Sequence, residues 1–174
     1  MTSIEPYTFS ECTELTDIKI PSSVTKIWQG AFSGCEGLTE INLPENLRII
    51  KMAAFSGCTG LTEMKIPNGI TTIEEYTFED CKNITKIELP NSVTEIRKGA
   101  FLKCQSLVKI NIPNNLERLE YYTFGYCENL ASITIPSSVK YIETQVFYRC
   151  EKLAEIHSSS MIPPTCRIHS FEGT

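Results

Sequence analysis

The chain of 174 residues has only two histidines and a single tryptophan, and it carries no excess of positive charge. Lysine and arginine number 16 against 21 aspartates and glutamates, so the net charge of −5 argues against a nucleic-acid-binding surface. Both histidines, His157 and His169, lie in an irregular C-terminal segment, and no Ser/His/Asp spacing, G-x-S-x-G motif or phosphate loop is present. With so few candidates for a general acid or base, we predict no enzyme activity and no cofactor.

Long apolar runs are also missing. No segment approaches the roughly 20 residues that a membrane-spanning helix needs, so no membrane span is expected. The N-terminal sequence MTSIEPYTFSECTEL has neither the basic region nor the apolar region of a signal peptide.

What the sequence does contain is a strict repeat of 23 residues in three columns. The proline column is Pro21, Pro44, Pro67, Pro90, Pro113 and Pro136. The phenylalanine column is Phe9, Phe32, Phe55, Phe78, Phe101, Phe124 and Phe147. The cysteine column is Cys12, Cys35, Cys58, Cys81, Cys104, Cys127 and Cys150. A fixed period of this length is the signature of a leucine-rich-repeat solenoid.

The closing part of each repeat alternates apolar and polar residues, as in residues 38–43, which is typical of a half-buried strand. Its inward positions are Ile18, Ile41, Met64, Ile87, Ile110, Ile133 and Ile156. Proline then ends the strand because it has no N–H to donate. The next segment, residues 24–27 in the first full copy, points an aliphatic side chain inward every third residue and predicts a short, bent second strand or extended run.

The sequence GAFSGC and its relatives form a second corner, where we expect Gly30, Gly34, Gly57 and Gly99 to permit tight turns. In each copy Phe fills the wide end of the coil and Cys fills a narrower gap as a small apolar side chain. A single coil does not bury its own faces, so coils stacked about 4.8 Å apart share one core.

Eight cysteines raise the alternatives of a metal site or disulfides. Zinc sites use converging CxxC pairs, often with histidine, whereas these cysteines are 23 residues apart without a histidine partner. Stacked parallel columns point their side chains the same way, which disfavours disulfides between coils. We therefore expect the in-register cysteines to be buried free thiols, in a reducing or anaerobic setting, with Cys166 as the accessible one.

The stretch LTEINLPENLRIIKMAAFSGC and its sister copies resemble the BspA-like leucine-rich-repeat family of bacterial and protist surface proteins. The shared features are the 23-residue length, the LPxxLxxI segment and the AF-xx-C corner, from Ile4 to about Phe171. The resemblance implies an adhesin or interaction protein at the cell surface or secreted, with a host matrix or cell-surface protein as ligand. It carries over core positions, and no binding residue follows from it.

The fold class we expect is mainly β: a right-handed leucine-rich-repeat solenoid of about seven coils with parallel sheets and little helix. Residues 1–174 form a single array, with a partial first coil at 1–20, regular coils at 21–158 and an atypical terminal repeat at 159–174, where Phe171 falls one residue out of register. Because no terminal cap is visible, we expect an excerpt of a longer protein, with the possibility of end-to-end self-association.

Solenoids bind partners through repeated exposed surfaces. On the closing strand, Glu63 is predicted to face Lys86 and Lys65 to face Glu88 in the next coil, a pattern typical of a solvated, self-complementary face. Aromatic residues at variable positions are the candidate partner-binding residues, with packing against the corner as the alternative. They are Trp28, which interrupts a charged column, and Tyr121, Tyr122, Tyr126, Tyr141 and Tyr148.

We therefore predict a non-enzymatic protein–protein interaction module of a cell-surface or secreted adhesin-like protein. Two alternatives remain open. One is a structural spacer that carries another domain, and the other is an intracellular leucine-rich-repeat scaffold, consistent with the unpaired cysteines.

Overall fold

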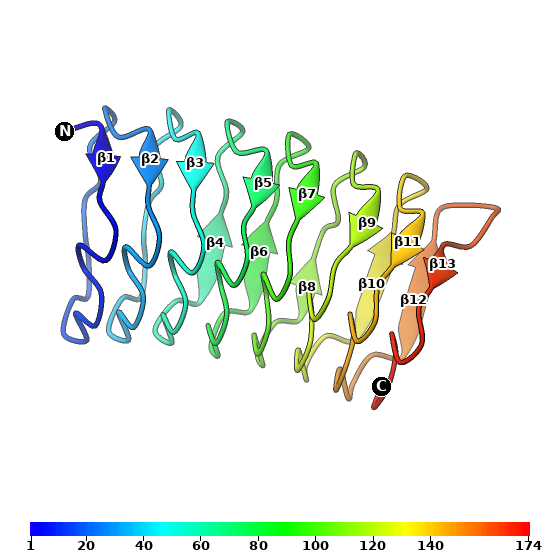
Figure 1. Cartoon of the computed structure of the whole chain (residues 1–174). Coiled ribbons are helices and arrows are strands. Elements are labelled where there is room, and N and C mark those ends of the chain that lie inside the picture. Colours follow the sequence, from blue (N-terminus) through cyan, green and yellow to red (C-terminus); the bar gives the residue numbers. More distant parts are fainter.

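The computed structural model describes all residues, 1–174, and contains no helix. Thirteen short strands wind in about seven turns into an elongated solenoid with the two termini at opposite ends (Figure 1). Strands pair in parallel, and each pairs with its counterpart in a neighbouring coil. The predicted mainly-β leucine-rich-repeat solenoid is thereby confirmed.

One side of the solenoid carries a two-residue strand in every coil, as the spacing of inward aliphatic residues predicts. Val24 and Ile27 are both fully buried, whereas Lys26 between them is exposed. The strands of this side are β1 (Ser3–Ile4), β2 (Lys26–Ile27), β3 (Ile49–Ile50), β5 (Thr72–Ile73), β7 (Glu95–Ile96), β9 (Arg118–Leu119), β11 (Tyr141–Ile142) and β13 (Thr165–Cys166).

The opposite side is built from the closing parts of the repeats. Its strands are β4 (Glu63–Lys65), β6 (Lys86–Glu88), β8 (Lys109–Ile110), β10 (Ser132–Ile135) and β12 (Glu155–Ser158). The predicted alternation is observed, because Met64 and Ile87 are buried and the residues on either side of them are exposed.

This second sheet begins only in the third coil. The strand predicted at residues 38–43 is wrong, because Lys19 and Asn42 form an isolated bridge there and no ladder follows. The backbone hydrogen bond from Thr39 to Thr16 is long, at 3.4 Å, so the first two coils are less tightly joined along this side.

All eight phenylalanines of the chain stack in one continuous column through the core. Ring centroids of successive coils lie between 5.2 Å (Phe9 and Phe32) and 5.9 Å (Phe78 and Phe101), with planes within 11° of parallel. Offset parallel stacking adds to the hydrophobic gain of burial. Phe32 through Phe147 are fully buried, whereas Phe9 is half-buried at the first coil.

Six cysteines of the column are fully buried, but the prediction is wrong for Cys12, which is exposed. Each buried thiol leans toward the preceding coil and donates to a phenylalanine carbonyl there, as Cys35 does to Phe9 at 3.0 Å and Cys150 to Phe124 at 3.1 Å. No coil of the structure precedes Cys12, so its side chain stays uncovered. The cysteines therefore link coils by hydrogen bonds as well as filling space.

The corner between the two sheets contains two left-handed residues in each coil. Five glycines have positive φ, including the predicted Gly30, Gly34, Gly57 and Gly99, and eleven other residues share these columns at φ between 55° and 63°. Because a left-handed conformation is costly for residues with a Cβ atom, the whole corner must be held in place by its neighbours. Backbone bonds between coils do this, for example from Phe32 N to Ala54 O at 2.8 Å.

The C-terminal coil absorbs one extra residue without losing the core column. Ile142 pairs with Cys166, and the loop between β12 and β13 contains the insertion. The ring of Phe171 consequently stacks on Phe147 at 5.3 Å, back in register. Ile156 is in register with the buried Ile133, as predicted, but its side chain is 45% exposed because no further coil covers β12 on this side.

Candidate interaction surface

Four of the five predicted tyrosines meet at one corner of the solenoid, in the sixth and seventh coils. Tyr122 and Tyr148 lie edge to face with ring centroids 6.1 Å apart, and Tyr126 and Tyr148 do so at 5.3 Å. Tyr121 extends the cluster, with its ring 5.6 Å from that of Tyr122. We call these four residues the tyrosine corner.

Two other corner tyrosines pack on glycine. Tyr7 and Tyr76 occupy the same column as Tyr122, and their rings lie over Gly30 and Gly99 of the following coil. A Cβ atom at Gly30 would fall 2.4 Å from the Tyr7 ring, and one at Gly99 would fall 2.5 Å from the Tyr76 ring. The proposal that this column packs on the corner therefore holds for both residues.

Tyr122 behaves differently because the following coil has Gln145 where a glycine would receive its ring. The ring instead lies beside Tyr148 and over Gly125 of its own coil, where a Cβ atom would be 2.9 Å from Tyr122 Cδ1. Burial, together with the nearby Tyr126 and Tyr148, raises the pKa of the Tyr122 hydroxyl above its ordinary value. The tyrosine corner is thus a mutually packed aromatic surface, with Tyr121 still 41% exposed.

The fifth tyrosine, Tyr141, lies apart on strand β11. Its strand neighbour Arg118 places its guanidinium 5.0 Å from the ring centroid, and Arg118 also pairs with Glu143 at 3.0 Å. Tyr141 is 44% exposed and makes no ring contact with the other tyrosines. Tyr141 is therefore not part of the tyrosine corner, although the sequence analysis grouped it with those four tyrosines.

Trp28 follows strand β2 and is half-buried, outside the core. The ammonium group of Lys26 lies 5.8 Å from the centre of its ring. The Trp28 ring is therefore neither part of the core nor fully exposed. Farther along the same column, Glu74 joins Lys51 at 3.0 Å and Arg97 at 2.9 Å, so the charges that Trp28 interrupts form a ladder of ion pairs.

The tyrosine corner also has cationic neighbours that were not predicted from the sequence. Lys98 precedes Tyr121 in its column, and Lys103 and Arg149 flank Tyr126 in another. The guanidinium of Arg149 lies 6.0 Å from the centre of the Tyr148 ring. The 23-residue period would have identified these neighbours had the columns beside each tyrosine been aligned.

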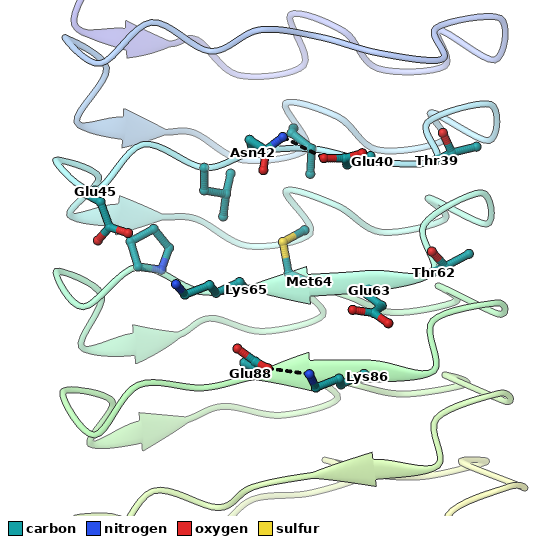
Figure 2. A pocket seen from close by; sticks show the side chains of 13 residues that line it. Thr39, Glu40, Asn42, Glu45, Thr62, Glu63, Met64, Lys65, Lys86 and Glu88 are labelled. Carbon is teal, nitrogen blue, oxygen red and sulfur yellow. Dashed lines mark hydrogen bonds and ion pairs between the residues drawn. The ribbon is translucent and has the colours of Figure 1, made fainter.

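The sheet of closing strands carries a charged hollow around β4 and β6 (Figure 2). The predicted register is observed, with Glu63 opposite Lys86 and Lys65 opposite Glu88. Lys86, however, forms its ion pair with Glu88 of its own strand, and its neighbour on the other side is Lys109. The face is therefore only partly self-complementary, and it has no aromatic side chain that would anchor a partner.

The cysteines offer no reactive centre inside the solenoid. Burial raises the pKa of the Cys35 thiol to about 11 and that of Cys150 to about 12, and it raises the pKa of Cys81 well above its ordinary range. These thiols are neutral at physiological pH and hence poor nucleophiles. No group of His, Cys, Asp and Glu side chains has the arrangement of a metal site. No helix of a length and hydrophobicity suited to crossing a bilayer occurs in the structure.

Comparison with known families gives a match over almost the whole chain. The model of the BspA type leucine rich repeat region matches in six copies, over residues 2–131 and 71–173. None of the curated protein sequences compared with the chain matches it.

Solved structures with the same architecture come from bacteria. A leucine-rich repeat protein from Bacteroides ovatus is 34% identical over 89% of this chain with a TM-score of 0.86, and the chain spans 40% of its length. The leucine-rich repeat protein of T. pallidum is 34% identical over 87% of this chain and 71% of its own, with a TM-score of 0.83. A leucine rich cell surface protein from Faecalibacterium prausnitzii is 26% identical over 92% of this chain and 58% of its own, with a TM-score of 0.57.

Proposed function

This chain belongs to the BspA-type leucine-rich-repeat family, and on that premise we propose that it is a non-enzymatic protein–protein interaction module of a cell-surface or secreted adhesin-like protein. Its ligand is a protein of the host matrix or of a cell surface. The repeat stack supplies a rigid scaffold, and side chains at variable positions of its corners supply recognition.

The observation that carries the proposal is the tyrosine corner. The corner places aromatic side chains on the outside of the chain, whereas the phenylalanines lie almost entirely in the core. The outer side chains are Tyr121, Tyr122, Tyr126 and Tyr148. Tyrosine is enriched among the residues that dominate binding energy, because a rigid ring contributes large contact area at low entropic cost. Trp28 and Tyr141 are secondary anchors within the same proposal.

The surface location is supported by the description of one relative. The Faecalibacterium prausnitzii protein is a leucine rich cell surface protein, and it shares the solenoid architecture. A surface module would meet partners through its exposed corners while six of its eight thiols stay inside the core.

A structural spacer is the second candidate function, and the phenylalanine column favours it. Eight stacked rings and a backbone ladder through every corner make a stiff rod, suited to holding another domain at a distance. A spacer needs no recognition surface, so binding by the isolated chain distinguishes the two functions.

The test is surface plasmon resonance of the isolated chain against a panel of purified extracellular-matrix and cell-surface proteins. The proposal predicts saturable binding to at least one of them, weakened by Tyr148→Ala. Trp28→Ala and Tyr141→Ala, measured in parallel, establish whether the secondary anchors contribute. Absence of saturable binding across the panel would favour the spacer.

A further inference from the structure

The tyrosine corner has a definite charge environment, which narrows the chemistry of its partner. Lys103 and Arg149 occupy the corner column directly before and after Tyr126, and Lys98 stands directly before Tyr121 in a second column. Backbone hydrogen bonds fix this arrangement, from Lys103 N to Gly125 O at 2.8 Å and from Gly99 N to Tyr121 O at 2.9 Å. The three cations, which we call the cationic rim, therefore border the aromatic surface.

The cationic rim is poorly neutralised by the chain itself. The ammonium group of Lys98 lies 5.7 Å from the centre of the Tyr76 ring, and the charge of Lys103 acts on the carboxyl group of Glu79. Arg149 reaches Glu151 only at 3.7 Å, with both side chains of this pair more than half exposed. Exposed pairs of this kind contribute little, so their charge stays available to a partner.

Acidic side chains also lie near the corner, and most of them already have partners. Asp80 pairs with Lys82 at 3.4 Å, and Glu120 accepts a hydrogen bond from the backbone N–H of Lys98 at 3.1 Å. Glu172 lies 3.2 Å from His169, and its charge also acts on the Tyr122 hydroxyl. Glu79, whose carboxyl pKa burial raises, lies one coil before Lys103. The weakly paired Arg149 thus leaves positive charge beside partly exposed aromatic area, although the chain as a whole has a net charge of −5.

The angles between the tyrosine rings favour a peptide over a sugar as the ligand of the corner. Tyr126 and Tyr148 cross at 75°, and Tyr122 and Tyr148 cross at 88°. A pyranose ring stacks on a flat aromatic face, whereas crossed rings present their edges, which contact aliphatic or proline side chains. The hydroxyl groups of the tyrosines add donors for carboxylates and backbone carbonyls.

We infer that the tyrosine corner, with its rim of Lys98, Lys103 and Arg149, binds an acidic protein segment in which apolar side chains alternate with aspartate or glutamate. The rings bury the apolar side chains, and the cationic rim pairs with the carboxylates and speeds association. This inference rests on the proposed function, because it names the partner chemistry of the same site.

The experiment selects a displayed library of random short peptides against the native chain and measures the affinity of the enriched peptides by fluorescence anisotropy. We expect enriched peptides to be acidic with interspersed apolar residues. Their affinity falls about tenfold or more with Tyr148→Ala or with the double variant Lys103→Glu and Arg149→Glu, and it falls as salt rises. Charge reversal leaves the core untouched, so the double variant tests the site independently of any effect of Tyr148→Ala on folding. The matched control, Lys86→Glu with Lys109→Glu on the closing sheet, leaves affinity unchanged.

The inference is overturned if the enriched peptides are basic or neutral. It is also overturned if their affinity is the same for the wild-type chain and the corner variants. If Trp28→Ala alone abolishes their binding, the proposed function stands and this site is wrong. If no acidic peptide is enriched but the chain retains heparin through the corner, the inferred acidic peptide is wrong and the ligand is an anionic polysaccharide. Concentration-dependent self-association that the corner variants abolish replaces it with a second copy of the chain. A library without any specific binder contradicts both the inference and the proposed function.

Discussion

The Sγ atom of Cys81 lies 3.1 Å from the carbonyl oxygen of Phe55, to which its thiol donates a hydrogen bond across the boundary between two coils. The same bond recurs from Cys58 to Phe32 and from Cys104 to Phe78. The carbonyl of Phe55 also accepts the backbone N–H of Cys58 at 3.2 Å, so the thiol adds a second hydrogen bond to an oxygen that has two lone pairs. The cysteine column therefore owes its place to both size and hydrogen bonding.

Thiol labelling tests the placement of the cysteines. In the native protein we expect a thiol reagent to modify Cys12 and Cys166, which are exposed, and to leave the six buried thiols unmodified until denaturant is added. Mass spectrometry of digested protein identifies the labelled positions. Rapid labelling of Cys81 without denaturant would show that the coils open readily or that the column is wrongly placed.

Stability is predicted to fall in alkaline solution. The six buried thiols have raised pKa values in the folded state, about 11 for Cys35 and about 12 for Cys150, against about 8.5 in an unfolded chain. The folded state thus retains protons that the unfolded state loses as pH rises above about 8.5, so the free energy of unfolding decreases there and is insensitive to these groups below it. Urea unfolding at several pH values measures the slope, and Cys81→Ala should flatten it. An unchanged slope in that variant would contradict the assignment.

Substitution of core phenylalanines should depend on position in the stack. Phe78 is fully buried between Phe55 and Phe101, so Phe78→Ala should lower the free energy of unfolding by about 3–5 kcal/mol. Phe9 is half-buried and has one stacking neighbour, so Phe9→Ala should cost less. Equal shifts in denaturant midpoint would show that the first coil is as well ordered as the fourth.

The left-handed corner predicts opposite effects of two reciprocal substitutions. Gly57 has φ of 72°, and an added Cβ atom would make only ordinary contact with Gly34 at 3.5 Å, so Gly57→Ala should destabilise by about 1–2 kcal/mol through backbone strain alone. Ala53 has φ of 55°, and Ala53→Gly should relieve strain and be neutral or stabilising by up to about 1 kcal/mol. Thermal unfolding of both variants provides the comparison, and destabilisation by both would refute the strain argument.

The repeating core was predictable because equivalent positions of successive coils pack against each other in the same way. Three columns at one spacing identified the Phe stack, the buried Ile27 and Met64 positions and the register of Glu63 with Lys86. Burial was mispredicted where a coil lacks a neighbour, at Cys12 and Ile156, since burial there depends on what stacks against the coil and not on the repeat itself. The strand expected at residues 38–43 is a separate error, because only the bridge between Lys19 and Asn42 forms there.

The candidate site was less predictable. A period locates Tyr122 in a corner column, but whether its ring covers the next coil depends on the residue there, which is Gln145 instead of a glycine. Side-chain direction likewise separated Tyr141 from the corner and left Trp28 half-buried. The extra residue before β13 moved Phe171 back into the stack, a shift that the length of a loop does not reveal.

Recognition of a protein partner by the tyrosine corner is tested most directly with two variants, Tyr148→Ala and Tyr7→Ala. Their affinities are compared for a ligand that binds the wild-type chain. Tyr7 is the matched control, because it is a corner tyrosine with 55% exposure whose ring packs on Gly30 outside the cluster. Recognition by the tyrosine corner predicts that Tyr148→Ala weakens binding about tenfold or more while its thermal midpoint stays close to wild type, and that Tyr7→Ala leaves affinity unchanged. Equal affinities of wild type and Tyr148→Ala, with both proteins folded, would contradict it.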